Sequence, residues 1–251
     1  MIKIIPGKCE GCVGRAAADV IESVISENPE AVIGLATGSS PLSTYRELIA
    51  RYNAGKISFA KVKSVNLDEY VGLAPDHDQS YAYFMNANLF SKVDIKPENT
   101  NIPSGLAKDA LAECKRYDDV IASFGGVDVQ VLGIGNNGHI GFNEPDDHFT
   151  KGTGLVNLTD STIDANSRFF ASRDLVPTQA LSMGIGQIMS AKKILLIALG
   201  KGKAEILERA LFGDVTPAVP ASILQFANDV VVCADEAALS VIAEKHPEAL
   251  A

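Results

Sequence analysis

The sequence predicts an α/β protein with a mainly parallel central sheet covered by helices on both faces. Strand and helix patterns alternate along the 251 residues, and most strand patterns are continuous apolar runs. Parallel strands are buried on both faces, so uninterrupted apolar runs between helices are typical of this class. A content of 47% hydrophobic and 21% charged residues suits a packed protein with one sizeable core.

Short apolar runs mark the strands, and helical spacing of apolar residues marks the helices between them. We expect strands at residues 1–5, 31–36, 62–67, 127–132, 193–199 and 229–233. Proline suits the first helical position, so Pro41 favours a helix start there. We expect helices at residues 10–27, 41–52, 79–91, 109–124, 177–190 and 203–212, and a closing helix from Glu236.

We expect residues 1–251 to form a single domain, because no internal repeat or low-complexity segment interrupts the alternation. Residues 145–176 are more polar and have shorter patterns than the rest of the chain. This segment fits an inserted lid, and it also fits a plain surface excursion.

The charge balance narrows the classes of partner. A net charge of −9 and a pI near 4.9 speak against nucleic acid and against an anionic membrane surface. A small anionic substrate remains compatible, because two or three local cations are enough to bind one phosphate. No apolar run reaches about 18 residues and no signal peptide opens the chain, so we expect a cytoplasmic protein.

The cysteines and histidines predict no metal site. Cys9 and Cys12 have redox spacing, but they precede a helical pattern without a recognisable thioredoxin-like unit, so we expect the spacing to be coincidental. A lone pair cannot close a four-ligand zinc site. We expect Cys114 and Cys233 to behave as small hydrophobic residues. None of the histidines shows helical metal-ligand spacing; they lie at positions 77, 139, 148 and 246.

The loop at residues 133–145, GIGNNGHIGFNEP, directly follows the apolar run at 127–132. Glycines after a buried strand indicate a sharp turn, and ligands of open α/β sheets bind at such carboxyl ends. His139 and Glu144 combine imidazole with carboxylate, the usual chemistry for moving protons near neutral pH. They are the first catalytic candidates, although a purely structural turn also fits the loop when it is considered alone.

The same loop contains the dinucleotide-binding spacing Gly133-x-Gly135-x-x-Gly138, with Asp160 further along. That fingerprint requires a helix to open at its third glycine. Gly141, Asn143 and Pro145 follow too closely for a helix to continue, so the context argues against a nucleotide site.

Residues 36–41, ATGSSP, close a strand and open a helix. Ser40 suits the N-cap and Pro41 the first helical position. Free backbone N–H groups at such a helix start favour an anion, while simple capping also accounts for the pattern.

Charged side chains follow the other predicted strands. Asp68 and Glu69 end one strand, and because neighbouring side chains alternate we expect only one to enter a site. Taken alone, the pair fits an ordinary helix cap or a solvated pair better. Arg168 and Lys203, with Lys201 as a neighbour, are suited to hold a phosphate. Together these strand ends would converge on one edge of the sheet, as a site for a small phosphorylated molecule requires.

Motifs across most of the chain resemble those of glucosamine-6-phosphate deaminases. They are LATGSSP at 35–41, NLDEYVG at 66–72, SYAYFM at 80–85, GNNGHIGFNEP at 135–145, ANSRFF at 165–170 and ALGKGKA at 198–204. The resemblance implies an α/β three-layer, Rossmann-like fold. It also implies conversion of D-glucosamine 6-phosphate and water to D-fructose 6-phosphate and ammonia by ring opening, enolisation and aldose–ketose isomerisation, in amino-sugar catabolism and N-acetylglucosamine degradation. No metal or other cofactor is implied.

By this resemblance, Asp68 is similar to the family's base for enolisation. His139, with Asn137 and Glu144, resembles its ring-opening group. The residues that would hold the substrate phosphate are Thr37, Gly38, Ser39, Ser40, Arg168 and Lys203. Some members have aspartate where Asn137 stands, so here a hydrogen bond can orient His139 without an added negative charge.

Members regulated by N-acetylglucosamine 6-phosphate carry basic residues soon after the NEP motif and an aromatic residue in a longer tail. Here Gly154 and Val156 stand in that stretch and the sequence stops at Ala251. We therefore expect hyperbolic kinetics and a monomer, with a homo-oligomer still open. Two alternatives remain: a 6-phosphogluconolactonase-like hydrolase and a non-catalytic sugar-phosphate-sensing domain.

Overall fold

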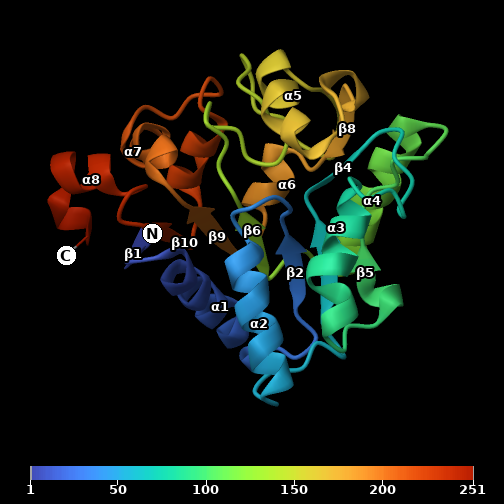
Figure 1. The fold of residues 1–251 in the computed structure, drawn as a ribbon, viewed down its shortest axis with the longest axis horizontal. Coiled ribbons are helices and arrows are strands. Elements are labelled where there is room, and N and C mark those ends of the chain that lie inside the picture. Colours follow the sequence, from blue (N-terminus) through green and yellow to red (C-terminus); the bar gives the residue numbers. More distant parts are fainter. Residues whose placement is uncertain (1, 251) are drawn as a thin grey trace.

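The computed structural model describes residues 2–250 and shows a three-layer α/β arrangement (Figure 1). Within these residues the central sheet has seven strands in the order β1-β10-β9-β6-β2-β3-β5, and all neighbours pair in parallel. This arrangement confirms the predicted fold class. The strands are β1 (Ile2–Gly7), β2 (Val32–Leu35), β3 (Lys63–Asn66), β5 (Thr100–Asn101), β6 (Val129–Leu132), β9 (Lys193–Ala198) and β10 (Val230–Asp235). The expected first strand included Met1, which lies outside the described residues.

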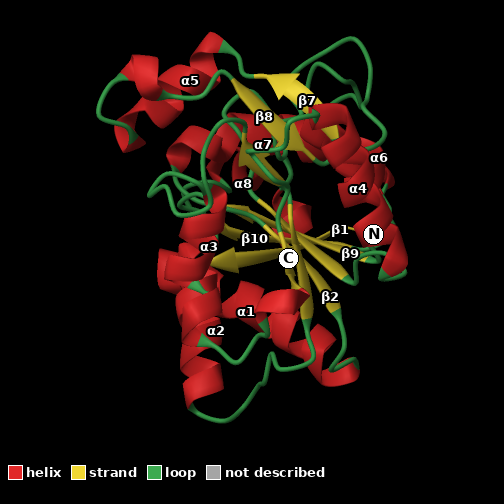
Figure 2. Cartoon of the chain, turned by 90° about the vertical axis from the view of Figure 1, so that its right-hand side faces the viewer, coloured by secondary structure: helices red, strands yellow, loops and turns green. Residues whose placement is uncertain are grey.

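Helices cover both faces of this sheet, with α1, α2 and α3 on one side and α4 and α6 on the other (Figure 2). Among the described residues, no helix has both the length and the apolar character that crossing a membrane demands. The helices are α1 (Glu10–Glu27), α2 (Leu42–Asn53), α3 (Tyr81–Asn88), α4 (Ala110–Ser123), α6 (Ile185–Met189), α7 (Ala204–Phe212) and α8 (Ser240–Lys245).

A second, antiparallel sheet lies beyond the carboxyl edge of the first (Figure 2). Its strands are β4 (Asp68–Tyr70), β8 (Gln179–Ser182) and β7 (Gly154–Asn157), in that order. With α5 (Asp160–Asn166), this sheet encloses its own apolar cluster. The members of the cluster are Tyr70, Phe142, Leu158, Ile163, Val176 and Ala180.

The expected helix at 177–190 is wrong in its first half. Residues Gln179–Ser182 form β8, which pairs with β4 and β7, and only Ile185–Met189 are helical. Both partner strands come from distant parts of the chain, so tertiary pairing overrides the local helical pattern. The closing helix also begins later than expected, at Ser240 rather than Glu236.

Close packing of α1 on α2 determines where the loop after β2 lies. A Cβ added at Gly14 of α1 would lie only 2.7 Å from the backbone carbon of Ser43 in α2. The buried Arg51 of α2 forms an ion pair with Asp19 of α1 at 2.8 Å. The Gly14–Ser43 contact holds the first turn of α2 against α1, directly after the loop at residues 36–41, and the Arg51–Asp19 pair holds the last turn.

Gly14→Ala is expected to lower the free energy of unfolding by about 1–3 kcal/mol, because the added methyl overpacks the α1–α2 contact. Gly11→Ala is the matched control, since the nearest atom to its added Cβ is 3.8 Å away at the tip of Arg15. Removing a helical glycine there should be neutral or stabilising by up to about 1 kcal/mol. Urea unfolding of both variants measures the difference, and equal midpoints would contradict the packing argument.

Candidate active site

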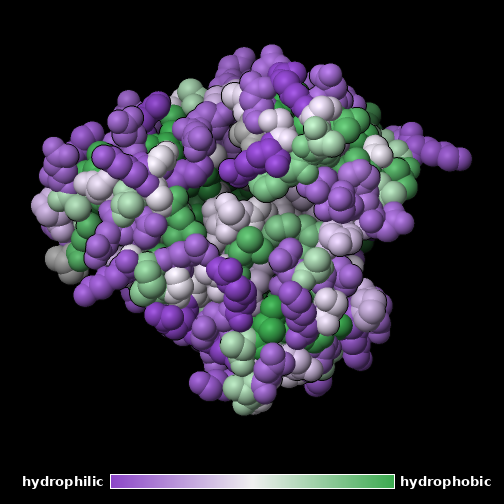
Figure 3. Space-filling view, viewed as in Figure 1, coloured by the Kyte–Doolittle hydropathy of each residue, from purple (hydrophilic) through white to green (hydrophobic). Residues whose placement is uncertain are grey.

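The predicted strand ends meet at one edge of the central sheet. β2 lies between β3 and β6, and β6 in turn pairs with β9. The loops that follow these strands carry residues 36–41, Asp68, residues 133–145 and residues 200–203. The molecular surface is hollowed on this face, between the part that carries α5 and the part that carries α1 and α2 (Figure 3).

Glycines shape the loop after β6. The imidazole of His139 lies against Gly135, where an added Cβ would come within 2.4 Å of the ring. Gly138 has a φ of +90°, a conformation that favours glycine. Turns and an isolated bridge between Ile140 and Asn143 follow, with no helix in residues 133–145. The argument against a dinucleotide fingerprint is therefore confirmed.

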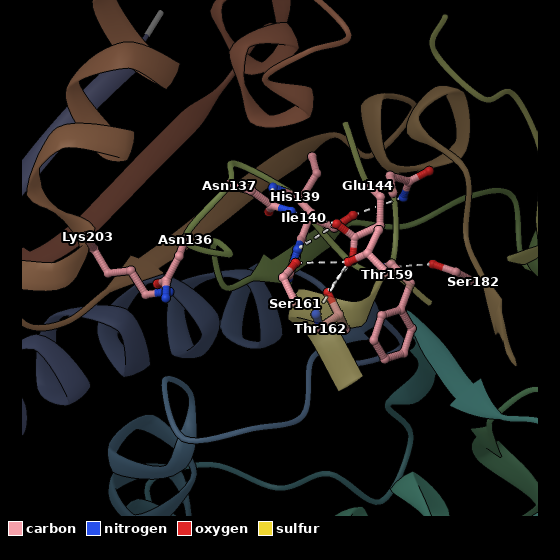
Figure 4. Close-up of polar contacts among 12 residues, drawn as sticks. Asn136, Asn137, His139, Ile140, Glu144, Thr159, Ser161, Thr162, Ser182 and Lys203 are labelled. Atoms are coloured by element: carbon pink, nitrogen blue, oxygen red, sulfur yellow. Dashed lines mark hydrogen bonds and ion pairs between the residues drawn. The ribbon is translucent and has the colours of Figure 1, made fainter. Parts of the chain in front are cut away.

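Asn137, His139 and Glu144 form a connected group (Figure 4). Nδ1 of His139 lies 3.4 Å from Oε2 of Glu144, an ion-pair distance without hydrogen-bond geometry. Nδ2 of Asn137 donates to the same oxygen at 2.7 Å. The expected hydrogen bond between Asn137 and His139 involves the backbone of the histidine. The N–H of His139 donates to Oδ1 of Asn137 at 3.2 Å. Asn137 thus orients the loop rather than the imidazole directly.

Glu144 also accepts a short hydrogen bond from Thr162 of α5. Burial raises the pKa of Glu144, but the close contact with His139 and its charge, together with hydrogen bonds from Thr162 and Asn137, outweigh this effect and lower the pKa to about 2. Glu144 is therefore ionised throughout the neutral range and can stabilise positive charge on the adjacent imidazole.

Asp68 and Glu69 are both buried, and their carboxylates point to different surroundings. Glu69 accepts three backbone hydrogen bonds at 2.9 Å, from Tyr70 and from Tyr81 and Ala82 of α3. Oδ2 of Asp68 lies 3.6 Å from the Cβ position of Gly141 in the central loop. Strand alternation thus directs one carboxylate to a helix start and the other to the loop of His139.

Burial raises the pKa of Asp68 to about 8, with the negative charge of Glu69 as a smaller cause. An aspartate with so high a pKa accepts a proton far more readily than an ordinary carboxylate. Perturbed carboxyl groups of this kind cluster at catalytic sites, where a base must work near neutral pH.

The start of α2, after the loop at residues 36–41, is capped differently from the prediction. Pro41, not Ser40, is the N-cap of α2, and no side chain caps the helix. Gly38 has a φ of +88° in this loop. Within residues 2–250, the backbone N–H groups of Gly38, Ser39 and Ser40 have no hydrogen-bond partner. Unsatisfied N–H groups at a helix start are ready donors for an anion.

Two cations close enough to influence each other have no carboxylate partner in the described part of the chain. Nζ of Lys203 donates to Oδ1 of Asn136 at 2.6 Å, and Arg168 stacks on the ring of Phe169. Burial lowers the pKa of Lys203, and the positive charge of Arg168 lowers it further. An anion bound between them would relieve this repulsion. Lys201 is exposed and belongs to the short helical turn before Lys203.

Thr162 and Ser182 contribute contacts that the sequence did not indicate. Thr162 binds Glu144 from α5, in a segment for which the sequence predicted no helix. Ser182 stands opposite Asp68 in the β4–β8 register, and its hydroxyl accepts the N–H of Phe142 at 3.0 Å. Both residues come from segments brought in by tertiary pairing, so no local motif could have identified them.

One exposed group has the composition of a cation site. Asp146, Asp147 and His148 bring potential ligand atoms within 4.8 Å of one another. A hydrogen bond to Asp147 and the charges of both aspartates raise the pKa of His148. All three side chains are exposed, and exposed acidic groups commonly gather in this way without a metal.

Comparison with known proteins agrees with this geometry. Residues 11–233 match the family described as glucosamine-6-phosphate isomerases/6-phosphogluconolactonase. The chain belongs to this family. A relative from Lachnoclostridium phytofermentans, named glucosamine-6-phosphate deaminase, is 55% identical over 236 residues, covering 94% of this chain and 100% of the relative.

Solved structures of the family share the fold. A monomeric glucosamine-6-phosphate deaminase superposes with a TM-score of 0.93 and 44% identity, over 95% of this chain and 99% of that one. A 6-phosphogluconolactonase from Trypanosoma brucei has a TM-score of 0.76 at 18% identity, over 98% and 99% of the two chains, and shows the fold alone.

The raised pKa of Asp68 makes the stability of this family member depend on pH. The folded state keeps the proton up to a pH of about 8, whereas an unfolded aspartate loses it near about 3.9, so stability falls as pH rises between these values. Asp68→Asn removes the buried charge. The free energy of unfolding of Asp68→Asn should exceed that of the wild type by an amount that grows from pH 5 to pH 9 and reaches the order of a few kcal/mol.

Urea unfolding at pH 5, 7 and 9 measures this gain. Asp174→Asn, at an exposed carboxylate, is the control and should show a difference that does not change with pH. A pH-independent difference for Asp68→Asn as well would contradict the burial of its charge.

Proposed function

We propose that this protein is a glucosamine-6-phosphate deaminase, converting D-glucosamine 6-phosphate and water to D-fructose 6-phosphate and ammonia. The observation that carries the proposal is the buried Asp68 carboxylate beside the loop of His139. Enolisation needs a base to remove the C2 proton, and a pKa of about 8 suits that task near neutral pH. Hydrolysis of a lactone has no such step, so Asp68 favours the deaminase over the lactonase reaction.

The phosphate-binding residues in this proposal are Thr37, Gly38, Ser39, Ser40, Arg168 and Lys203. Unpaired N–H groups and two cations without carboxylate partners support this assignment. A phosphate bound there would orient the rest of the sugar toward Asp68 and His139. Its binding energy positions C1 and C2 for reaction.

The ring-opening group is His139, supported by Glu144 and Asn137. Opening the pyranose moves a proton from the C1 hydroxyl to the ring oxygen, and His139 carries it. The ionised Glu144 at 3.4 Å stabilises the imidazolium that forms in transit. Asn137 keeps the Glu144 carboxylate and the backbone of His139 in place.

Asp68 then acts on the open chain. It takes the proton from C2, which the C1 aldehyde has made acidic, and an enolamine forms. Returning that proton to C1 gives an imine at C2. Water adds to the imine, the C–N bond breaks, and ammonia leaves with fructose 6-phosphate as the ketone product.

We further propose that the segment at 145–176 acts as a lid that supplies Arg168 and Thr162 to the site. The enzyme would serve cytoplasmic amino-sugar catabolism, in N-acetylglucosamine degradation, and work as a monomer. The monomeric relative of the same fold supports the last point.

The direct test measures ammonia and fructose 6-phosphate released from glucosamine 6-phosphate, with free glucosamine as comparison. Each charge-assisted hydrogen bond to phosphate contributes about 1.5–3 kcal/mol, so free glucosamine should be at best a very poor substrate. Asp68→Asn should lower turnover about 10²–10⁴-fold while substrate still binds. Equal efficiency on both sugars, or full activity of the variant, would refute the assignments.

Thr162→Val is expected to lower kcat about tenfold at every pH from 5 to 9, because losing its hydrogen bond frees the Glu144 carboxylate to move and loosens the His139–Glu144 pair. Thr162→Ser keeps the hydroxyl and should retain most of the activity. Steady-state kinetics across pH 5 to 9 measure both variants. If valine and serine behave alike, the hydroxyl has no role beyond packing.

We expect hyperbolic kinetics without activation by N-acetylglucosamine 6-phosphate. A phosphorylated effector needs cations at its site, and it must bind one conformational state better than another. Gly154 has no side chain and lies in open space, since an added Cβ there would meet no atom within 4 Å. The side chain of Val156 offers an effector neither charge nor hydrogen-bond donor. Substrate titrations with and without that compound measure the effect, and sigmoidal curves that it makes hyperbolic would overturn the prediction.

A further inference from the structure

The expectation that the Cys9–Cys12 spacing is coincidental is wrong, because a disulfide joins the two residues. β1 ends at Gly7, Cys9 is the N-cap of α1, and the helix begins at Glu10. A Cys-x-x-Cys motif between a parallel strand and the start of a helix is the arrangement in which proteins carry out thiol–disulfide exchange.

The surroundings of the two sulfurs stabilise the charge that exchange requires. The N–H of Cys12 donates to Sγ of Cys9 at 3.1 Å, in the positive field of the α1 N-terminus. Nη2 of Arg15 lies 3.5 Å from Sγ of Cys12. Helix N-termini and neighbouring arginines both favour a thiolate over a thiol, so each sulfur has a group that stabilises it in the reduced state.

The disulfide has little to contribute as a structural staple. Its sequence separation is only 3, and stabilisation by a disulfide grows with the length of the loop it closes. The helix start has independent support, since the cap hydrogen bond needs only the sulfur of Cys9, and Glu10 pairs with Arg46 of α2 at 2.6 Å. The fold therefore accommodates both the disulfide and the dithiol.

Accessibility separates this pair from the other cysteines. Cys9 is exposed and Cys12 half-buried, so a reagent reaches Cys9 first. Cys114 and Cys233 are free and buried, and burial raises the pKa of both thiols, that of Cys233 to about 12. Exchange under native conditions is thus confined to the start of α1.

We propose that Cys9 and Cys12 form a redox-active disulfide that exchanges with dithiols. A thiolate of the dithiol attacks Sγ of Cys9, the Cys9–Cys12 bond breaks, and Cys12 leaves as a thiolate beside Arg15. The second thiolate of the dithiol attacks its own sulfur in the mixed disulfide and releases Cys9. Two electrons pass to the protein, which ends as the dithiol, and the reagent ends as its cyclic disulfide.

Equilibration with dithiothreitol at graded ratios of reduced to oxidised reagent, followed by native alkylation and mass spectrometry, tests the exchange. Cys9 and Cys12 should gain label together in one two-electron transition, while Cys114 and Cys233 stay unlabelled until the protein is unfolded. Labels that appear on one cysteine only, or a pair that never forms a disulfide at any ratio, would overturn the proposal. This readout does not depend on deaminase activity.

Single variants test the order of attack. Cys12→Ser leaves the exposed Cys9 thiol and should form a stable mixed disulfide with an aryl disulfide reagent. Cys9→Ser keeps the helix cap, because serine is a preferred N-cap residue, and should react at least about tenfold more slowly through the half-buried Cys12. Equal rates in the two folded variants would contradict Cys9 as the attacked sulfur, and circular dichroism verifies that both fold.

Discussion

The Glu144 carboxylate joins the central loop to the segment that follows it. One oxygen accepts from Asn137 and faces His139, while the other accepts from Thr162 of α5. These groups come from the loop after β6 and from a helix beyond β7. Because a buried carboxylate needs donors around it, this single group determines how the outer part of the molecule lies over the edge of the sheet.

Apolar side chains buried in the parallel sheet below the site stabilise the fold. This stabilisation offsets the free-energy cost of the polar arrangement at the edge of the sheet. The central strands β2, β6, β9 and β10 are almost wholly buried, whereas the segments at the carboxyl ends of the sheet carry polar groups whose charges are not balanced within residues 2–250. Asp68 is buried without a cation, and Lys203 repels Arg168. Each of these costs stability in the free protein. In the proposed mechanism, the substrate phosphate would lie between the two cations and the C2 proton would pass to Asp68.

Much of this could be predicted from the residues. The continuous apolar runs correctly indicated a parallel sheet, and α1 spans the expected residues Glu10–Glu27. Glycines after β6 correctly indicated a turn rather than a nucleotide-binding helix. The second sheet could not be anticipated, because β4 is three residues long and its partner β8 lies more than 100 residues further along the chain, so no local periodicity identifies it. For Asn137 the family motif indicated the partners His139 and Glu144, but only the structure shows that Asn137 contacts the backbone of His139 rather than its imidazole.

The sequence by itself determined the class of fold, the chemistry gathered at the carboxyl edge and the motifs that relate the chain to its family. Local patterns carry this information because burial and turn formation depend on neighbouring residues. Only the tertiary structure decided which groups meet: Thr162 with Glu144, Asp68 with Gly141, and Cys9 with Cys12 at a strand-to-helix junction. The burial, pKa and accessibility of a side chain depend on residues that are distant in the sequence and close in the fold. These properties determine the reactivity of the side chains at the site.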